Sequence, residues 1–330
     1  MTGTGQSFRA EEMALELRDF LSRRQDIVFQ VHSAFKKAVN LLTSDRVLVT
    51  LVGEGRDLTP MGAVVPKLHN LLLPGGSRVS FSEGVFSLPD NQGVIDTRGA
   101  VARHTRLPGP LSAGRQDQVL ALIRDKLAAA DKGGIASLVT VLPGKEKKLP
   151  PAPLNMYSAF ILKDLGRFLQ ACQEDDLDRA AGLARALIGF GPGLTPSCDD
   201  FMTGILLSFY YLPGRGPEEH RTACFFGQIE KMALERTNLI SYHMIRHAVR
   251  GHAGLLYLEA LRAAGAGDLA AMGPVIDRLL DFGASSGADF LYGLYCGQIL
   301  LPKPLAAVHR PVFNQEFPGQ AGDFTEKMTG

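Results

Sequence analysis

At residues 189–201 the chain reads Gly189-Phe190-Gly191-Pro192-Gly193-Leu194-Thr195-Pro196-Ser197-Cys198-Asp199-Asp200-Phe201, and an apolar segment follows at once. Glycines let backbone N–H groups approach a ligand closely. The first turn of a helix has unpaired N–H groups and partial positive charge. A glycine-rich loop that opens a buried helix therefore predicts a site for an anionic group. The loop is neither a Walker A motif, which would continue with Gly-Lys-Ser/Thr, nor a Rossmann fingerprint.

A weaker copy of this stretch occurs later in the chain. Ser197, Asp200, Phe201 and Gly204 of the first copy align with Ser286, Asp289, Phe290 and Gly293 of the second. Ser-x-x-Asp before an apolar run is typical of a capping box. In the first copy, Thr195 as N-cap with Pro196 at the first helical position fits equally well. Both segments are apolar nearly all round and have small residues four apart, so they predict two buried helices that cross near their glycines.

The two acids of the first copy are expected to differ in role. Asp200 has a counterpart in the repeat and is interpreted as structural. Asp199 has none and is the better candidate for catalysis, with Thr195 beside it; the alternative is that Asp199 is an exposed acid favoured by the helix dipole. An ordinary capped core helix is the favoured interpretation of the second copy, whereas the first loop has more glycine than a cap requires.

Composition sets limits on the possible functions. The chain has 330 residues, 45% of them hydrophobic, which is enough for two domains of ordinary size. A net charge of +1 argues against a nucleic-acid surface or an anionic membrane as partner. The cysteines have no C-x-x-C spacing, which argues against a disulfide framework or a cysteine-rich zinc site. The start of the chain is polar, so no secretory signal is expected. No apolar run is long enough to predict a membrane span. A cytoplasmic protein is expected.

The texture of the sequence changes once along the chain. Short β-like runs separated by turn residues occur at 47–52, 71–73, 79–81, 85–88 and 138–142. The charged, proline-rich tract Lys145–Pro153 then forms the best boundary. We therefore predict an α+β protein in which residues 1–150 form a β-rich N-terminal domain with flanking helices. Residues 151–330 are expected to form a mainly α-helical domain with the glycine-rich loop and its repeat.

Helical periodicity predicts helices at 8–24, 115–130, 155–171, 174–188, 198–212, 218–248, 252–264, 268–281 and 287–301. A further helix containing Lys36, Lys37 and Asn40 is expected after Ser33, with this serine as its N-cap.

The segment 236–247 is dense in polar groups for a helix that also has apolar residues. Thr237, Asn238 and Ser241 are candidate ligand contacts, or a face that packs on the N-terminal domain. Arg236 is suited to meet a carboxylate with two hydrogen bonds, although most arginines on helices are solvated. A metal held by His243 and His247 would need a third ligand such as His252. Surface or hydrogen-bonded histidines are the favoured interpretation, so we predict no metal.

The motif Gly-x-Gly-Pro-Gly-Leu-Thr-Pro-Ser-x-Asp-Asp-Phe, followed by Gly204, resembles the signature of the AllH-like family. Members are described as a subunit of oxamate carbamoyltransferase, encoded with genes of anaerobic purine and allantoin breakdown. The segments His32–Asn40, Thr237–Gly251 and Gly283–Asp289 resemble other family motifs, so the resemblance covers about residues 31–300. Cys198 stands where the family pattern has glycine.

This resemblance implies reversible conversion of oxalurate and phosphate to oxamate and carbamoyl phosphate by a multisubunit complex in the cytoplasm. The site must neutralise anions and polarise a carbonyl, which needs no organic cofactor. The expected contacts with oxamate, carbamoyl phosphate or phosphate come from Gly191, Gly193, Thr195, Ser197, Arg236, Thr237, Asn238 and Ser241. The expected partners are the other subunits, and homo-oligomerisation is left open. The alternatives are a non-catalytic anion-binding or scaffolding subunit, and a lone enzyme acting on another carboxylate.

Overall fold

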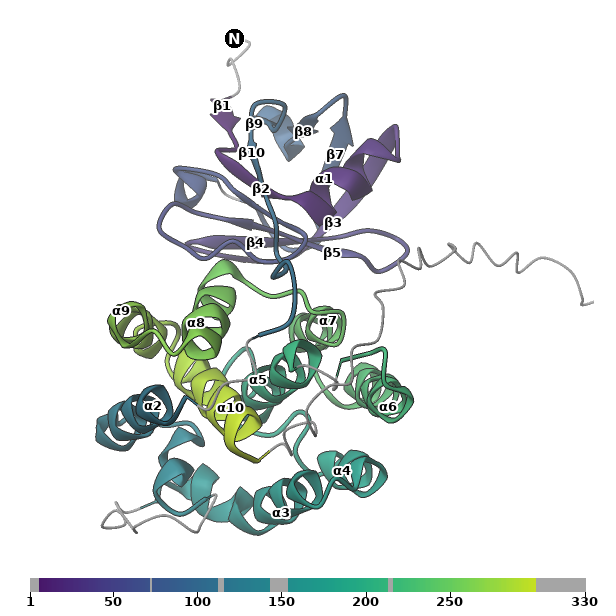
Figure 1. Cartoon of the computed structure of the whole chain (residues 1–330). Coiled ribbons are helices and arrows are strands. Elements are labelled where there is room, and N and C mark those ends of the chain that lie inside the picture. The colour runs from purple at the N-terminus through teal and green to yellow at the C-terminus, as the bar shows by residue number, and fades with distance from the viewer. Residues whose placement is uncertain (1–5, 72, 112–115, 143–153, 213–215, 301–330) are drawn as a thin grey trace, which may run out of the picture.

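The computed structural model describes residues 6–71, 73–111, 116–142, 154–212 and 216–300. A curled sheet forms one end of the molecule, and helices form the other (Figure 1). The predicted α+β class, with the strands first and the helices after them, is confirmed. The predicted boundary tract Lys145–Pro153 lies outside the described residues.

The strands form one sheet in the order β1-β9-β8-β7-β3-β4-β5-β6-β2-β10. Their bounds are β1 (Gln6–Arg9), β2 (Glu12–Ala14), β3 (Asp26–Phe35), β4 (Ala38–Leu42), β5 (Leu48–Val52), β6 (Gly62–Val64), β7 (Arg78–Ser82), β8 (Val85–Ser87), β9 (Gly93–Asp96) and β10 (Val101–Arg103). β1 pairs with β9 at one end of the sheet, whereas β2 pairs with β6 and β10 at the other. Because β1 and β2 are nearly continuous in the chain, this segment joins the two ends and curls the sheet around its core.

The helix expected around Lys36, Lys37 and Asn40 is wrong. Side chains of β3 alternate between exposed and buried up to His32, which is the period of a strand. The lysines lie in the turn between β3 and β4, and Asn40 is buried on β4. Ser33, the expected N-cap, instead accepts a hydrogen bond from Nδ2 of Asn40 (3.0 Å). Pairing with the neighbouring strands β7 and β5 has overridden the local helical spacing.

Most predicted helices are present, with bounds α1 (Leu15–Ser22), α2 (Asp117–Ala129), α3 (Met156–Gln173), α4 (Leu177–Ala184), α5 (Ser197–Tyr211), α6 (His220–Arg236), α7 (Leu239–Ala248), α8 (Leu255–Ala266), α9 (Leu269–Leu280) and α10 (Ser286–Leu300). The short 3-10 helices are η1 (Leu68–Asn70), η2 (Pro89–Asn91) and η3 (Ala136–Thr140).

Three of the predicted elements need correction. The helix over 8–24 is restricted to α1, because β1 and β2 precede it. The helix over 218–248 is broken at Thr237 and Asn238, where the asparagine side chain caps α7 by accepting from the N–H of Ser241. The strand over 138–142 is the 3-10 helix η3 instead. The strand expected at 71–73 includes residue 72, which lies outside the described residues.

The predicted crossing of the two repeat helices is confirmed. α5 and α10 lie against each other at the centre of the helical layer (Figure 1). A Cβ on Gly204 would collide with the Phe290 carbonyl, and one on Gly293 would collide with the Phe201 carbonyl. Glycine at the crossing is therefore required for the backbones to approach this closely.

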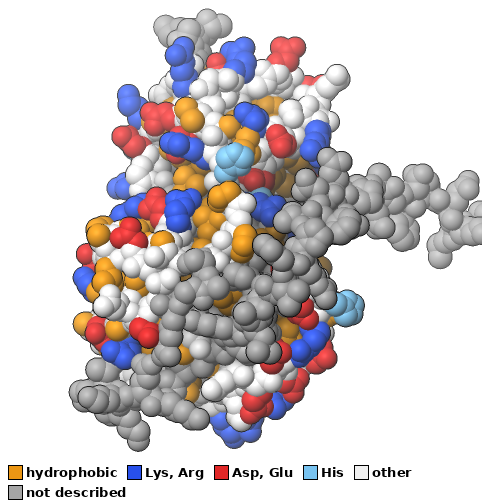
Figure 2. Space-filling model, in the orientation of Figure 1, with side chains coloured by type: hydrophobic (Ala, Val, Ile, Leu, Met, Phe, Trp, Pro, Cys, Tyr) orange, Lys and Arg blue, Asp and Glu red, His pale blue; other side chains and the backbone are white. Residues whose placement is uncertain are grey.

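The sheet and the helices meet along α7 and α8. Val52, Leu58 and Val64 form a small buried cluster that packs against Leu255 of α8. Next to this cluster, Oδ1 of Asp57 accepts a hydrogen bond from the Leu256 N–H (2.9 Å). The junction is thus packed and hydrogen-bonded. On the face shown in Figure 2, acidic and basic side chains are interspersed. None of the described helices is long and apolar enough to cross a bilayer.

Candidate functional site

A cavity of about 180 Å³ lies at the junction between the sheet and the helices. The sheet domain contributes side chains from β5 and the loop after it, and the helical domain contributes side chains from the glycine-rich loop, α5, α7 and α8. Its polar lining consists of Thr50, Asp57, Thr59, Thr195, Asp200, Thr203, His243, His247, His252 and Tyr257. Pockets for drug-sized ligands have volumes of roughly 300–1,000 Å³. This cavity therefore suits a metabolite of few heavy atoms.

Two polar atoms in the cavity lining have no hydrogen-bond partner. They are Oγ1 of Thr59, from the sheet domain, and Oδ1 of Asp200, from α5, and both atoms are buried. Buried polar atoms are nearly always hydrogen-bonded, because leaving one unpaired costs about 1–3 kcal/mol. Each wall of the cavity thus includes a residue with a buried oxygen that has no hydrogen-bond partner.

Asp200 is held by hydroxyl groups from both copies of the repeat. Its Oδ2 accepts from Oγ1 of Thr195 (3.0 Å), and that hydroxyl lies 2.9 Å from Oγ of Ser286. Burial raises the pKa of Asp200 well above its usual range, and the nearby carboxylate of Asp289 raises it further. Burial therefore favours the protonated form of Asp200.

Burial also favours the neutral forms of Asp57, His243 and His247 in the cavity wall. Burial raises the pKa of Asp57 to about 7. Burial lowers the pKa of His243 to about 4 and of His247 to about 3, and the positive charge of Arg246 acts in the same direction. Lysine and arginine are absent from the described residues that line the cavity. Near pH 7 the cavity thus offers hydrogen bonds and little charge.

The three histidines do not form a metal centre in the part of the chain that the structure describes, where no group of three or more His, Cys, Asp or Glu side chains is placed to hold an ion. Nε2 of His243 lies 3.1 Å from the backbone carbonyl of Arg46 and so donates to it. Nδ1 of His252 lies 3.2 Å from Oε1 of Glu16 in α1. The rings of His243 and His252 are therefore each held by an oxygen from the strand-containing part of the chain.

The glycine-rich loop folds back over the N-terminus of α5. The N–H of Cys198 donates to the Phe190 carbonyl (3.0 Å), and the N–H groups of Asp199 and Asp200 donate to the Pro196 carbonyl (2.8 and 3.2 Å). Gly191 has φ 121°, and a Cβ there would collide with the Ser197 N–H. Protein groups thus occupy most of the helix end at which an anion was expected.

Neither predicted cap of α5 is correct. Pro196 is the N-cap, and the helix begins at Ser197 with no side-chain cap. Asp200 bonds to Thr195 instead of reaching back to the backbone of a capping serine. In the second copy, Oδ1 of Asp289 accepts from the N–H groups of Ile135 and Ala136 in η3 (2.7 and 3.0 Å). Asp289 thus holds η3, whereas Asp200 holds Thr195 in the loop just before its own helix.

Asp199 is fully buried, so the alternative of an exposed first-turn acid is wrong. Its Oδ1 accepts from the Gly189 N–H (2.8 Å), and its Oδ2 accepts from the Thr237 hydroxyl. Asn238 adds a second tie by donating from Nδ2 to the Leu194 carbonyl (2.8 Å). These contacts join the glycine-rich loop to the break between α6 and α7.

The predicted site residues therefore form one connected region, of which Thr195 lines the cavity. Ser197 and Ser241 are fully buried beside it, whereas Arg236 and Gly193 are exposed. Anion binding by these residues, with Gly191, Thr237 and Asn238, stays a prediction. Sequence reasoning missed Glu16, Asp57 and Thr59, because only the folded chain brings Asp57 and Thr59 to the cavity and Glu16 to His252. His252 was considered only as a metal ligand.

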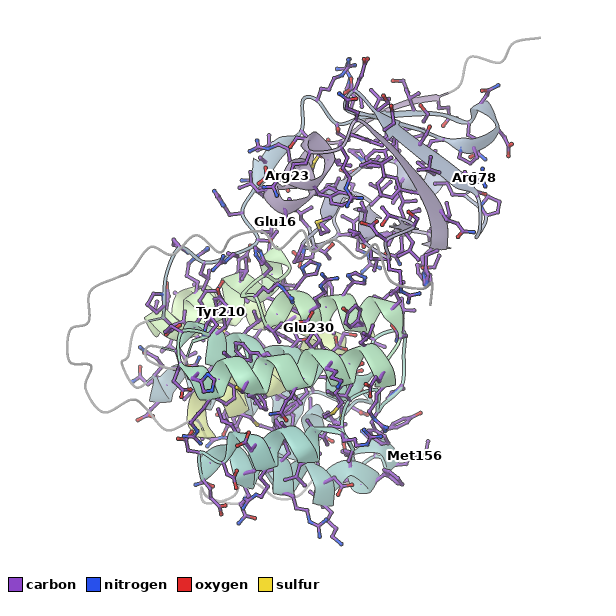
Figure 3. The ribbon with its side chains drawn as sticks, turned by 90° about the vertical axis from the view of Figure 1, so that its right-hand side faces the viewer. Glu16, Arg23, Arg78, Met156, Tyr210 and Glu230 are labelled. Atoms are coloured by element: carbon purple, nitrogen blue, oxygen red, sulfur yellow. The ribbon has the colours of Figure 1, made fainter. Side chains whose placement is uncertain are left out.

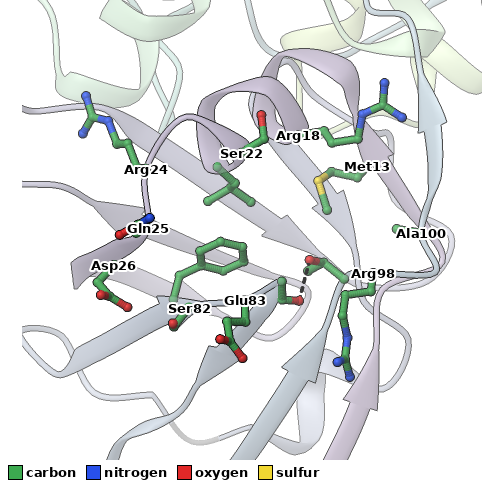
Figure 4. A pocket seen from close by; sticks show the side chains of 14 residues that line it. Met13, Arg18, Ser22, Arg24, Gln25, Asp26, Ser82, Glu83, Arg98 and Ala100 are labelled. Atoms are coloured by element: carbon green, nitrogen blue, oxygen red, sulfur yellow. Dashed lines mark hydrogen bonds between the residues drawn. The ribbon is translucent and has the colours of Figure 1, made fainter.

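A larger hollow of about 700 Å³ lies in the sheet domain beside α1 (Figure 4). Two of its arginines have carboxylate partners: Arg24 pairs with Asp45 (2.7 Å) and Arg98 with Asp96 (2.8 Å). None of its described lining residues has a buried polar atom without a partner. The smaller cavity at the junction is therefore the stronger candidate site.

Comparison with known proteins gives two family matches. The model of the AllH family N-terminal domain matches residues 9–103, and the model described as oxamate carbamoyltransferase subunit AllH matches residues 187–298. The two matches together cover most of the chain, and they include the residues on both sides of the cavity. No solved structure matches the chain.

Proposed function

This chain belongs to the AllH family, and from that premise we propose that it is a subunit of a carbamoyltransferase complex whose substrate binds in the junction cavity. The proposed reaction converts oxalurate and phosphate to oxamate and carbamoyl phosphate in anaerobic purine and allantoin catabolism, in the cytoplasm. The observation that carries the choice of site is the pair of unpaired atoms, Oγ1 of Thr59 and Oδ1 of Asp200.

The reaction needs one bond formed, one bond broken and one proton moved. An oxygen of hydrogen phosphate attacks the ureido carbon of oxalurate, and the bond from that carbon to the oxamate nitrogen breaks. The nitrogen must gain the proton that phosphate loses. Asp200, whose burial favours the protonated carboxyl, is the acid that we assign to the departing nitrogen. We assign the Thr59 hydroxyl as the donor to the carbonyl oxygen, where negative charge develops.

The nearly neutral cavity favours the uncharged ureido group over the phosphate. A buried anion without a cation partner is strongly unfavourable, and the described lining has no lysine or arginine. We therefore place the carbamoyl centre inside the cavity and the anionic ends of the substrates at its mouth. Positive charge for those ends would come from other subunits of the complex, which fits the function of the chain as one subunit among several.

The proposal is tested by transfer of the carbamoyl group from carbamoyl phosphate to oxamate, with the wild-type chain combined with its partner subunits. Asp200→Asn keeps the shape of the side chain and removes its transferable proton, so kcat should fall by about 10²–10⁴. Asp199→Asn is the matched control, since this neighbouring acid is equally buried and is absent from the cavity lining. Asp199→Asn should mainly lower the stability of the fold, and its effect on kcat should be smaller than that of Asp200→Asn.

Unchanged turnover in Asp200→Asn would contradict a catalytic cavity and favour the scaffolding alternative. Thermal-shift measurements with oxamate, oxalurate and phosphate separate the two further. If the cavity is catalytic, oxalurate should raise the thermal midpoint of the chain, and Thr59→Val should abolish this rise. A scaffolding subunit should show no response that depends on Thr59.

A further inference from the structure

We infer that Glu16 is a positioning residue, which holds His252 with its Nδ1 protonated and thereby offers Nε2 to a ligand in the cavity. The inference about ring geometry stands on contacts in the structure. Its catalytic consequence rests on the proposed function.

Glu16 reaches the helical domain from the first turn of α1. Its Oε1 lies 3.2 Å from Nδ1 of His252, and its Oε2 accepts from Oγ1 of Thr105 (2.8 Å). That same threonine hydroxyl lies 3.1 Å from Nδ1 of His252. Thr105 is fully buried, and its carbonyl accepts from the N–H of Ala253 (3.0 Å). This bond joins the backbone of Thr105 to the residue that follows His252. Figure 3 shows Glu16 at the lower edge of the sheet domain, facing the helices.

Hydrogen-bond accounting fixes the tautomer of His252. The Thr105 hydroxyl has one proton, and it donates that proton to Glu16. Toward Nδ1 of His252 this hydroxyl can therefore only accept, as can the Glu16 carboxylate. Burial opposes the charge of Glu16, but its hydrogen bonds, first among them the one from His252, lower its pKa to about 2, so it is ionised. With two acceptors around it, Nδ1 of His252 carries a proton, and Nε2 is the ring nitrogen left for a ligand.

The ring of His252 forms part of the cavity wall, together with Asp200 and Tyr257. A base with a fixed tautomer, oriented by a carboxylate on its far nitrogen, is the arrangement that lets an imidazole accept a proton. In the proposed reaction, Nε2 accepts the proton of hydrogen phosphate as the new C–O bond forms. Asp200 gives its proton to the departing oxamate nitrogen as the C–N bond breaks. Proton transfer from His252 back to Asp200 restores both groups, so protons and charges balance over one turnover.

The test combines ring NMR with turnover of the reconstituted complex. Two-bond ¹H–¹⁵N correlation spectra report which ring nitrogen is protonated, and the His252→Gln spectrum identifies the signals of His252. The wild-type ring should be protonated at Nδ1, and in Glu16→Ala it should populate the Nε2-protonated form. In the carbamoyl-transfer assay, Glu16→Ala should lower kcat about 100-fold and change KM less than threefold. The isosteric Glu16→Gln, which keeps the packing, should lower kcat at least tenfold.

Glu12→Gln is the control. Like Glu16, Glu12 is a hydrogen-bonded glutamate, since it accepts from Nε of Arg103 (2.9 Å), and it is absent from the cavity lining. This substitution should leave the His252 signals and kcat unchanged. A His252 tautomer that is the same in wild type and Glu16→Ala would overturn the inference, as would wild-type kcat in Glu16→Gln. If the wild-type complex itself shows no transfer, the proposed function is wrong, and the ring spectra still decide the role of Glu16.

Discussion

At the scale of single residues, neighbouring acids have different tasks. Both oxygens of Asp199 are used by Gly189 and Thr237, which ties the loop to the α6–α7 break. Asp200, one position later, lines the cavity and has one oxygen without a partner. Successive positions of a helix point about 100° apart, so one acid faces the loop and the other faces the cavity. The sequence predicted a division of roles between these acids, with Asp199 as the functional one; the geometry leads us to propose Asp200.

The unpaired hydroxyl of Thr59 predicts that its removal makes the ligand-free protein more stable and weakens its binding of oxalurate. Thr59→Val removes a buried oxygen that has no partner and keeps the shape of the side chain. Since such an oxygen costs about 1–3 kcal/mol, the free energy of unfolding of the ligand-free variant should rise by about 1 kcal/mol. Affinity for oxalurate should fall at least tenfold in calorimetric titration. Thr140→Val is the contrast, because Oγ1 of Thr140 donates to the Ser137 carbonyl (3.0 Å) and its loss should destabilise the fold. A stability loss in both variants would show that Thr59 is satisfied by the protein.

At the scale of elements, α5 and α10 are the part of the fold that the sequence predicted best. Apolar periodicity, glycine spacing and the repeat are all local signals, and they indicated two buried helices in contact. The β3–β4 hairpin could not be predicted in this way, because its lysine-rich turn has helical spacing and only pairing with β5 and β7 decides the outcome. The break before α7 did have a local signal, an asparagine three residues before Ser241, which is typical of an N-cap.

The helix crossing leads to a stability prediction. Gly204→Ala should destabilise the fold by about 1–3 kcal/mol or more, because the added methyl would meet the backbone of Phe290 and Leu294. Gly182→Ala in α4 is the matched control, since a Cβ there meets nothing within 4 Å. It should stabilise the protein by up to about 1 kcal/mol through helix propensity. Urea unfolding of both variants measures the difference. Equal stabilisation by the two substitutions would contradict a tight crossing.

At the scale of the whole molecule, the candidate site exists only because the sheet and the helices meet. Glu16, Asp57 and Thr59 come from one domain, and Asp200 and His252 from the other. None of the first three has a sequence signal that separates it from an ordinary surface residue, since their partners lie far along the chain. Long-range contacts such as that between Asp57 and Leu256 determine the site, and they depend on how the domains pack. This explains why the sequence predicted the glycine-rich loop and missed the opposite wall.

The junction should also depend on pH through Asp57. This acid lies at the N-terminus of α8, where a negative charge is favoured, yet burial prevails and raises its pKa to about 7 from 3.8. Between about pH 4 and pH 7 the folded protein therefore keeps a proton that the unfolded chain has released. The contribution of Asp57 to the free energy of unfolding is thus greatest below pH 4 and is lost as the pH rises through 7.

Asp57→Asn keeps an oxygen for the Leu256 N–H and cannot ionise. The variant should match wild type in free energy of unfolding near pH 4 and exceed it by about 1–3 kcal/mol above pH 7. The difference stays within this range because Asp57 is partly exposed and its charge is partly screened. Asp178→Asn, at an exposed position of α4, should follow the wild-type profile throughout. Thermal unfolding across this pH range compares the three proteins. Parallel profiles for wild type and Asp57→Asn would mean that Asp57 is ionised in the folded protein, and the cavity would then have a fixed negative charge facing its ligand.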